Sequence, residues 1–532
     1  MASLVRALDG NAERHGSRLA CVVGAESLTY AELRDSSCRF AAALIDLGFR
    51  PGDRVSLYLP SSVSYVTCYL GAMRAGLVAN PINSVFTPHE VEYLLADSGA
   101  AALVTTPDLL AGLAGALSGT AVRAVITTAA PGRGGVQPET HALADLLTTA
   151  PRDLPYPGDE ATAILPYSSG TTGRSKGIVH SHHSLAMQAV LSANHLQMRP
   201  DDVLVQALPL VHLYPGNIIM GGLLVAGATM VVQPVFDPPG FATLLAQRRA
   251  TLCAGVPTTY AMLCQLDEQA VASLDLSALQ VAYSAGAPLP TRVRAEFRRI
   301  FGCRILDCYG ITEAAGNLTA TLRFGDTPEL SCGVPYPLTE VRIVDADDAE
   351  VPEGEVGQLI ARGPQIMGGY WNRPAETEAT LHGGWLHTGD LARRDANGFY
   401  YIVDRAKDVI LSGGYNVYPA EVEDVLQSHP DVAMCACFGV ADEIKGEKPW
   451  AAVVLRAGAQ VSEAELDQHC RQGLAAYKVP RRFLIVDELP RSSVGKILRR
   501  ELRARFGAGP ASADQSAATQ PSPPAPAREG AR

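Results

Sequence analysis

The chain contains 532 residues, which is too long for a single hydrophobic core, because domains usually hold about 50–250 residues. Its composition, with 47% hydrophobic and 19% charged residues, is typical of a folded protein and excludes disorder over most of the length. The net charge of −11 is spread along the chain without a long run of Lys and Arg, which excludes nucleic acid as an expected partner.

The N-terminal segment carries Asp9 and Glu13, where a secretory signal needs an uninterrupted apolar stretch. The most apolar segment, residues 218–232, is broken by three glycines and is shorter than the ~20 residues of a spanning helix. It predicts a buried helix followed by a strand, with no transmembrane segment. The 11 cysteines lack zinc-ligand spacing and are typical of buried thiols in a reducing compartment. A cytoplasmic protein is therefore expected.

Helical periodicity alternates with short strands over the first 400 residues or so, as in a helix at 31–47 followed by a strand at 55–59. Further strands are predicted at 161–165 and 230–233. This alternation predicts an α/β fold, with a large N-terminal domain of two α/β subdomains that contain parallel sheets. From 333 to 404 helices become rare and Gly/Asp turns frequent, which predicts an antiparallel or β-barrel-like subdomain.

A different pattern follows residues 404–408, and it predicts a small, mobile α+β C-terminal domain. Its expected helices lie near 420–428 and 463–474, and its expected strands lie near 433–438, 451–455 and 483–486. The end of the chain is rich in Ala, Pro and Ser and has no apolar periodicity, so burial cannot offset its ordering entropy. We expect a large domain at 1–403, a hinge at 404–408, a small domain at 409–506 and a disordered tail at 507–532.

A glycine-rich segment, YSSGTTGRSKG, follows the predicted strand at 161–165. Its glycines and hydroxyls allow backbone N–H groups and side chains to surround phosphate oxygens, and its lysine adds a positive charge. The Walker loop needs glycine immediately before this lysine, where the chain has Ser175, so a P-loop NTPase is excluded. The predicted phosphate-binding residues are Ser168, Ser169, Gly170, Thr171, Thr172, Gly173 and Lys176.

This loop resembles the signature of the adenylate-forming superfamily, which includes acyl-CoA synthetases, peptide-synthetase adenylation domains and luciferases. Four further segments resemble that family in the same order, and the resemblance runs from about residue 29 to 502. They read YGITE at 309–313, HTGD at 387–390, DRAKD at 404–408 leading to 413–421, and PRSSVGK at 490–496. The resemblance implies an enzyme that uses ATP and Mg²⁺ to convert a carboxylic acid into an acyl-AMP and then transfers the acyl group to coenzyme A.

Joining a carboxylate to the α-phosphate of ATP brings two anions together, so cations must offset their repulsion. The resemblance implies that Glu313 is the Mg²⁺ ligand and that Thr312 bonds a phosphate oxygen. It also implies that Tyr309 offers its aromatic face to adenine, that Asp390 binds the ribose hydroxyls, and that Arg405 grips ribose or phosphate oxygens. Further nucleotide-binding residues implied by the resemblance are Gly286, Ala287, Asp307, Cys308 and Gly310.

Lys496 resembles the family lysine that bridges the substrate carboxylate and the α-phosphate, and it is the first catalytic candidate. Gly413 and Gly414 resemble the glycine pair that lets the pantetheine arm of coenzyme A pass the backbone. Lys407 resembles the hinge about which the small domain rotates between the two half-reactions.

His212 lies in a segment that resembles the one gating the acyl pocket, and it joins Lys496, Glu313 and Thr312 among the catalytic candidates. This segment has no acidic residue to pair with an ammonium group, which disfavours an amino-acid substrate. A fatty, alicyclic or aryl acid is expected. The implied pocket walls are His212, Tyr214, Asn217, Tyr283, Gly286 and Asn317.

Two alternatives to a ligase that transfers the acyl group to free coenzyme A remain open. An acyl-AMP ligase that loads a carrier protein typically carries an insertion near 354–370, and none is visible. A catalytically silent nucleotide-binding regulator would have lost the lysine or the acidic metal ligand, whereas Lys496 and Glu313 are both present. A luciferase-type oxygenase is weaker, because the segment around His212 departs from the paired histidines of those enzymes.

Overall fold

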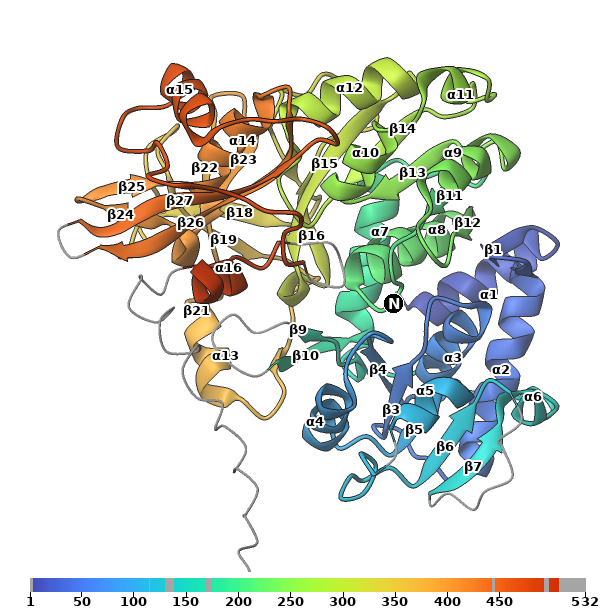
Figure 1. The fold of residues 1–532 in the computed structure, drawn as a ribbon. Helices are drawn as coiled ribbons and strands as arrows, with labels where there is room; N and C mark the ends of the chain where they lie inside the picture. The colour runs from blue at the N-terminus through green and yellow to red at the C-terminus, as the bar shows by residue number, and fades with distance from the viewer. Residues whose placement is uncertain are drawn as a thin grey trace, which may run out of the picture. The chain divides into compact units, whose positions relative to one another are not determined.

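The computed structural model of the chain describes residues 3–113, 115–129, 138–168, 175–442, 445–491 and 497–506. Residues up to Lys407 form one compact unit, and most residues from Asp408 onward form a second (Figure 1). The expected tail at 507–532, the loop residues Ser169, Gly170, Thr171, Thr172 and Gly173, and Lys496 lie outside the described residues. Across the described ranges, no helix is both long and apolar enough to cross a membrane.

Nine strands of the first unit form a mainly parallel sheet in the order β17-β16-β15-β14-β13-β11-β12-β1-β2. Strands β1 and β11 to β15 pair in parallel, whereas β2, β16 and β17 pair antiparallel at the two edges. The strand bounds are β1 (Leu19–Val23), β2 (Glu26–Thr29), β11 (Val203–Gln206), β12 (Thr229–Val232), β13 (Leu252–Gly255), β14 (Val281–Ser284), β15 (Arg304–Ile311), β16 (Gly316–Ala320) and β17 (Val334–Pro335).

A second nine-stranded sheet of the same unit has the order β20-β10-β8-β4-β3-β5-β6-β7, with β9 paired to β10. Strands β3 to β8 pair in parallel, and β10 runs antiparallel to β8, β9 and β20. The bounds are β3 (Arg54–Tyr58), β4 (Val78–Ile82), β5 (Ala102–Thr105), β6 (Ala124–Thr127), β7 (Glu139–Ala142), β8 (Thr162–Ile164), β9 (Tyr167–Ser168), β10 (Lys176–Ser181) and β20 (Gly369–Tyr370).

Helices cover both faces of these two sheets, as near-continuous apolar strands require. The largest hydrophobic core lies between the sheets and includes residues of α1 (Leu4–His15), α2 (Tyr30–Asp46), α3 (Val63–Arg74), α7 (His182–His195) and α8 (Met220–Ala226). The outer face of the first sheet packs against α9 (Pro238–Gln247), α10 (Pro257–Leu263), α11 (Glu268–Ala272) and α12 (Thr291–Phe301). The outer face of the second sheet packs against α4 (Pro88–Ser98) and α5 (Pro107–Gly112), and the short α6 (Leu143–Leu146) follows β7. The predicted α/β class is confirmed.

A five-stranded antiparallel sheet follows, in the region where the sequence predicts an antiparallel or barrel-like subdomain. It contains β18 (Glu340–Val344), β19 (Gly357–Arg362), β21 (Leu381–His382), β22 (Trp385–Arg394) and β23 (Tyr400–Arg405), with α13 (Pro374–Thr380) before β21. The register of β22 on β23 places Asp390 opposite Arg405.

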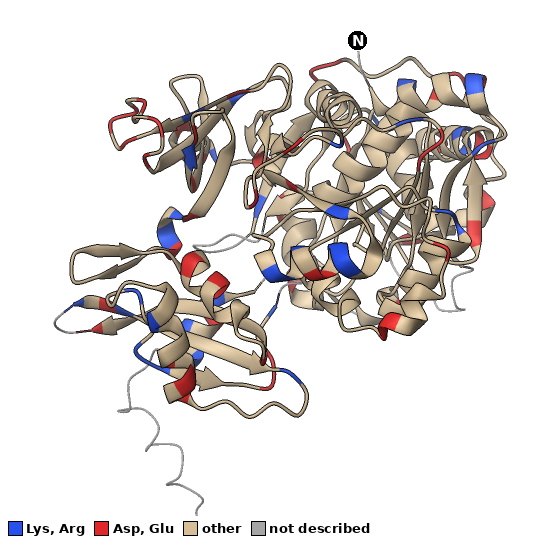
Figure 2. Cartoon of the chain, turned by 90° about the horizontal axis from the view of Figure 1, so that it is seen from above, with Lys and Arg blue, Asp and Glu red and all other residues tan. Residues whose placement is uncertain are grey.

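The second unit is α+β, as predicted. Its sheet has the order β25-β24-β27-β26 with β28 paired to β27. The bounds are β24 (Ile410–Ser412), β25 (Tyr415–Val417), α14 (Pro419–Ser428), β26 (Val432–Asp442), β27 (Gly446–Leu455), α15 (Glu463–Gly473), β28 (Phe483–Ile485) and α16 (Arg499–Phe506). Cys435 and Cys437 both lie in its core, as the sequence predicts for its cysteines in general. Acidic and basic residues are interspersed along each unit (Figure 2).

Candidate active site

Two residues predicted for phosphate and metal binding, Lys176 and Glu313, contact one tyrosine of the first unit, Tyr370. A short 3-10 helix, η2 (Thr312–Ala314), follows β15 and carries Thr312 and Glu313. The hydroxyl of Tyr370 donates a hydrogen bond to Glu313 Oε1 over 2.9 Å, and the Lys176 Nζ lies 4.8 Å from the centroid of the Tyr370 ring. Burial and the adjacent Glu313 raise the pKa of Tyr370, so its hydroxyl remains a donor to the carboxylate.

This arrangement fits a hard cation. The Tyr370 hydroxyl occupies one acceptor position on Glu313 and fixes the direction of the carboxylate, while a carboxylate has about four lone-pair positions to offer. Carboxylate oxygens are the ligands that Mg²⁺ prefers. The site therefore combines one oriented carboxylate, a group of the kind that binds metal ions, with a lysine near the same tyrosine, a group of the kind that binds phosphate.

Two backbone contacts hold the η2 turn in place. The carbonyl of Glu313 accepts a hydrogen bond from the N–H of Met367 over 2.8 Å. The carbonyl of Thr312 accepts one from His180 Nε2 over 2.7 Å. His180 is fully buried, and burial lowers its pKa to about 4, so the ring is neutral with its proton on Nε2. Sequence reasoning missed both Tyr370 and His180.

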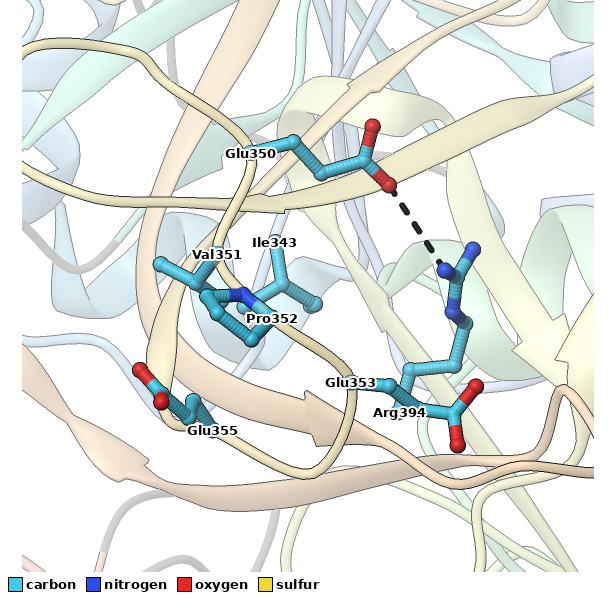
Figure 3. A pocket seen from close by; sticks show the side chains of 7 residues that line it. All are labelled: Ile343, Glu350, Val351, Pro352, Glu353, Glu355 and Arg394. Atoms are coloured by element: carbon cyan, nitrogen blue, oxygen red, sulfur yellow. Dashed lines mark ion pairs between the residues drawn. The ribbon is translucent and has the colours of Figure 1, made fainter.

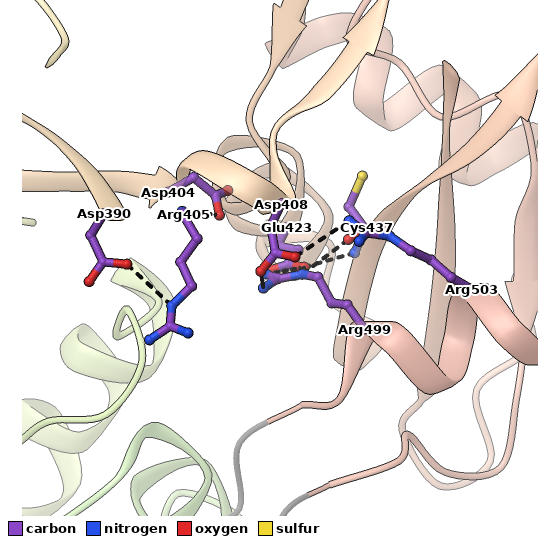
Figure 4. Close-up of polar contacts among 8 residues, drawn as sticks. All are labelled: Asp390, Asp404, Arg405, Asp408, Glu423, Cys437, Arg499 and Arg503. Carbon is purple, nitrogen blue, oxygen red and sulfur yellow. Dashed lines mark hydrogen bonds and ion pairs between the residues drawn. The ribbon is translucent and has the colours of Figure 1, made fainter. Parts of the chain in front are cut away.

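The residues predicted to bind the nucleoside also lie together. Asp390 accepts a hydrogen bond from the Tyr309 hydroxyl at Oδ2 over 2.7 Å, and its Oδ1 lies 3.2 Å from Arg405 Nε. Figure 4 shows the Asp390–Arg405 pair. Gly389 precedes Asp390 with φ of +70°, a conformation that favours glycine. The antiparallel pairing of β22 with β23 thus places Asp390 and Arg405 side by side.

The neighbouring residues of β14 and β15 play different parts. A Cβ at Gly310 would lie 1.9 Å from the carbonyl oxygen of Gly316, so only glycine fits between β15 and β16. Asp307 is paired with Arg294, and burial raises the pKa of Asp307. Cys308 is buried, whereas Gly286 and Ala287 are exposed in the loop after β14. The side chains of Asp307 and Cys308 are therefore occupied within the protein.

His212 lies just before a π-helix, η1 (Tyr214–Ile219), and π-helical turns are frequent at functional sites. Its Nε2 lies 3.2 Å from Asn83 Nδ2, and Asn83 Oδ1 accepts the N–H of Val85 over 3.2 Å, which fixes the amide orientation. His212 Nε2 is therefore the acceptor. Burial lowers the pKa of His212 to about 4, so the imidazole is neutral.

Four of the other predicted pocket walls make hydrogen bonds within the first unit. Tyr214 donates to the carbonyl of Tyr283 over 3.0 Å, and the Tyr283 hydroxyl donates to Leu196 over 2.9 Å. Asn217 Nδ2 donates to the carbonyl of Ala315 over 2.9 Å, and Asn317 Nδ2 donates to the Tyr336 hydroxyl over 3.1 Å. These contacts hold the candidates in one buried framework around η1. The small pocket of Figure 3 contains none of the predicted site residues and is lined by Ile343, Glu350, Val351, Pro352, Glu353, Glu355 and Arg394.

In the second unit, Gly413 and Gly414 form the turn between β24 and β25 with φ of +61° and +84°. Asp408 lies 3.5 Å from Arg503 and 3.9 Å from Arg499, and Arg499 also pairs with Glu423 over 2.8 Å (Figure 4). These pairs attach helix α16, which begins three residues after Lys496, to helix α14 and to Asp408, the first residue of the unit. Lys407, the last residue of the first unit's main segment, is exposed.

Comparison with known proteins decides the family. The family model described as "AMP-binding enzyme" matches residues 8–371, and the model described as "AMP-binding enzyme C-terminal domain" matches residues 421–496. The chain belongs to the AMP-binding enzyme family. The predicted membership of the adenylate-forming superfamily is thereby confirmed, and both domains of the family are present.

Relatives of this AMP-binding enzyme match over nearly their whole length. A feruloyl-CoA synthase of Amycolatopsis sp is 36% identical over 491 residues, which cover 91% of this chain and 95% of the relative. A long-chain-fatty-acid–CoA ligase of Escherichia coli O6:H1 is 35% identical over 535 residues, with 94% of each chain covered. The crystal structure of the anthranilate CoA ligase AuaEII in complex with anthranoyl-AMP is similar with a TM-score of 0.87 and 29% identity, covering 94% of this chain and 97% of that one.

Proposed function

We propose that this member of the AMP-binding enzyme family is an ATP-dependent carboxylic acid:coenzyme A ligase that works through an acyl-AMP. The observation that carries the proposal is the pair of clusters in the first unit. Tyr309, Asp390 and Arg405 offer groups for a nucleoside, and Lys176 and Glu313 offer groups for phosphates and a metal. The names of the relatives support the same chemistry, since all three are CoA synthases or ligases.

In the first half-reaction, a carboxylate oxygen attacks the α-phosphorus of ATP, the bond to the β-phosphate oxygen breaks, and pyrophosphate leaves. Mg²⁺ bound at Glu313 would neutralise charge on the phosphate oxygens. Lys176 and the Thr312 hydroxyl contribute a positive charge and a hydrogen-bond donor to the same oxygens. We assign to Lys496 the contact with both the carboxylate and the α-phosphate.

In the second half-reaction, the thiol of coenzyme A loses its proton and attacks the acyl carbon, and AMP leaves. Gly413 and Gly414 have no side chains, so a pantetheine arm can approach their backbone closely. We propose that the small domain at 409–506 rotates about the hinge at 404–408, with Lys407 as the pivot, so that Lys496 and the glycine turn act in succession.

The acid is proposed to be fatty, alicyclic or aryl. His212 is neutral and its segment offers no carboxylate to pair with an ammonium group, which disfavours an amino acid. The relatives named for feruloyl, long-chain fatty and anthranilate substrates fall within this range. A carrier protein remains the alternative acceptor, and a catalytically silent regulator is disfavoured by the presence of Glu313 and Lys496.

A panel of carboxylic acids with ATP, Mg²⁺ and coenzyme A tests the proposal, with pyrophosphate and acyl-CoA followed by mass spectrometry. A ligase of the proposed kind produces equal amounts of pyrophosphate, AMP and acyl-CoA with at least one acid. Acyl-AMP that accumulates and does not react with coenzyme A would favour the carrier-protein alternative. Nucleotide binding without pyrophosphate release from any acid would favour the regulator.

A further inference from the structure

Three side chains with metal-ligating atoms meet on the antiparallel sheet of the first unit: Asp348, His382 and His387. One ligand atom from each lies within 4.8 Å of the other two. Asp348 Oδ2 is 3.4 Å from His382 Nε2, and Asp348 Oδ1 is 3.7 Å from His387 Nδ1. None of the three has a role in the function proposed above.

The hairpin β21–β22 brings the two histidines together. Gly383 and Gly384 have φ of +59° and +81° and form a two-residue turn that pairs His382 with Trp385. Residues two apart on a strand share a face, so His387 lies on the same face as Trp385 and His382, opposite the buried Leu386. The two imidazole rings stack with centroids 3.6 Å apart and an interplanar angle of 13°, so their in-plane lone pairs run nearly parallel, and the half-exposed His382 ring has to turn for both nitrogens to face one ion.

A tight turn after β18 supplies the carboxylate. Asp345 Oδ1 accepts hydrogen bonds from the N–H groups of Asp347 and Ala349 over 2.9 and 3.0 Å. Asp348 takes up a left-handed conformation at the tip, with φ of +61°, which aspartate tolerates better than most residues. The side chain of Asp348 is 46% exposed and that of His382 is 44% exposed, whereas that of His387 is 8% exposed, so solvent ions reach the cluster from the side of Asp348 and His382.

One ring nitrogen of His382 is hydrogen-bonded to the backbone, and the other lies toward Asp348. His382 Nδ1 lies 3.2 Å from the carbonyl of Ala379, and because a carbonyl only accepts, Nδ1 carries a proton. The other ring nitrogen, Nε2, lies 3.4 Å from Asp348 Oδ2. A metal ion bound here would take Nε2 and the carboxylate oxygen as ligands.

We propose that Asp348, His382 and His387 form a binding site for a divalent transition metal of the zinc type. Imidazole nitrogen and carboxylate oxygen are ligands of Zn²⁺ at about 2.0–2.1 Å, and tetrahedral ligands at that radius lie about 3.4 Å apart. Asp348 Oδ2 faces His382 Nε2 over 3.4 Å and Asp348 Oδ1 faces His387 Nδ1 over 3.7 Å, so the carboxylate lies between the two imidazoles. Three protein ligands leave a fourth position for water. Mg²⁺ demands oxygen ligands and does not fit two imidazoles.

Equilibrium dialysis of the full-length protein against buffered Zn²⁺, with metal content measured by mass spectrometry, tests this site. The wild type is expected to hold one more zinc per chain than Asp348→Ala and His382→Ala, whose affinity should fall at least about tenfold. Asp347→Ala, from the same turn, and His89→Ala, an exposed histidine of α4, are matched controls that should bind zinc as the wild type does.

Two further results bear on the site. Zinc should raise the melting temperature of the wild type but not that of Asp348→Ala, because a ligand that binds only the folded state stabilises it. Millimolar Mg²⁺ should not displace the zinc. Equal zinc content in the wild type, Asp348→Ala and His382→Ala would overturn the proposal, as would displacement of the zinc by Mg²⁺.

Discussion

The Tyr309 hydroxyl donates a hydrogen bond to Asp390 over 2.7 Å, so the tyrosine fixes the position of one carboxylate oxygen. Arg405 contacts the other carboxylate oxygen over 3.2 Å. Asp390 is 4% exposed, and hydrogen bonds to both of its oxygens keep a buried carboxylate in one orientation. The ribose-binding acid we propose is therefore held from two sides before a nucleotide arrives.

Tyr309→Phe removes this donor and keeps the aromatic ring. A hydrogen bond to a charged group contributes about 1.5–3 kcal/mol, so the KM for ATP should rise by about tenfold or more while the KM for the acid changes little. Initial rates of pyrophosphate release at varied ATP measure this. An unchanged KM for ATP would show that Tyr309 does not orient Asp390 for the nucleotide.

Tyr370→Phe removes the donor that fixes Glu313. We expect the Mg²⁺ concentration for half-maximal rate to rise by about tenfold, because a carboxylate that is no longer held in place should bind Mg²⁺ about 1.4 kcal/mol more weakly. Glu313→Gln, which removes the ligand charge, should cost about 10²–10³ in rate. Tyr401→Phe is a matched control, because the Tyr401 hydroxyl donates over 2.9 Å to Asp395 on the neighbouring turn. Equal Mg²⁺ dependence in Tyr370→Phe and Tyr401→Phe would contradict the role of Tyr370.

The buried His180 makes stability depend on pH. Its pKa is lowered to about 4, whereas an unfolded histidine takes up a proton below about pH 6.5, so stability falls as the pH falls from about 6.5 to about 4. Each pH unit in that window costs about 1.4 kcal/mol for one such group. His180→Gln retains a donor for Thr312. When the pH falls from 7 to 5, the free energy of unfolding should decrease by about 2 kcal/mol less in this variant than in the wild type.

Urea denaturation at the two pH values measures this difference. His182 and His212 have pKa values lowered to about 4 as well, so His180→Gln keeps part of the acid sensitivity. The exposed His89→Gln should respond to pH as the wild type does. An identical pH response in His180→Gln and wild type would refute the account.

The sequence predicted Glu313, Asp390 and Arg405 because each lies in a short segment whose order along the chain resembles a family. It did not predict Tyr370 or His180. Tyr370 reaches Glu313 through the pairing of β20 with β10, which joins residues nearly 200 positions apart, and local periodicity does not identify such a partner. The ion pair of Asp307 with Arg294 was likewise not predicted, because Arg294 lies outside every motif that the sequence analysis used.

Lys496→Ala should separate the two half-reactions. Loss of one charge that stabilises the transition state costs about 10²–10³ in rate, so acyl-AMP formation should slow by that factor. Thioester formation from supplied acyl-AMP should be much less affected, because the lysine acts only where carboxylate meets α-phosphate. Rapid-quench measurement of each step decides this, and normal pyrophosphate release in the variant would exclude Lys496 from that role.

The route of the carboxylate oxygen tests the proposed ligase most directly. An acid labelled with ¹⁸O in both carboxylate oxygens is incubated with the enzyme, ATP, Mg²⁺ and coenzyme A, and the AMP and pyrophosphate are analysed by mass spectrometry. Attack on the α-phosphorus followed by thiol attack on the acyl carbon predicts one ¹⁸O atom in each AMP and none in pyrophosphate. Acyl-CoA formed with unlabelled AMP, or with the label in inorganic phosphate, would contradict the acyl-AMP route.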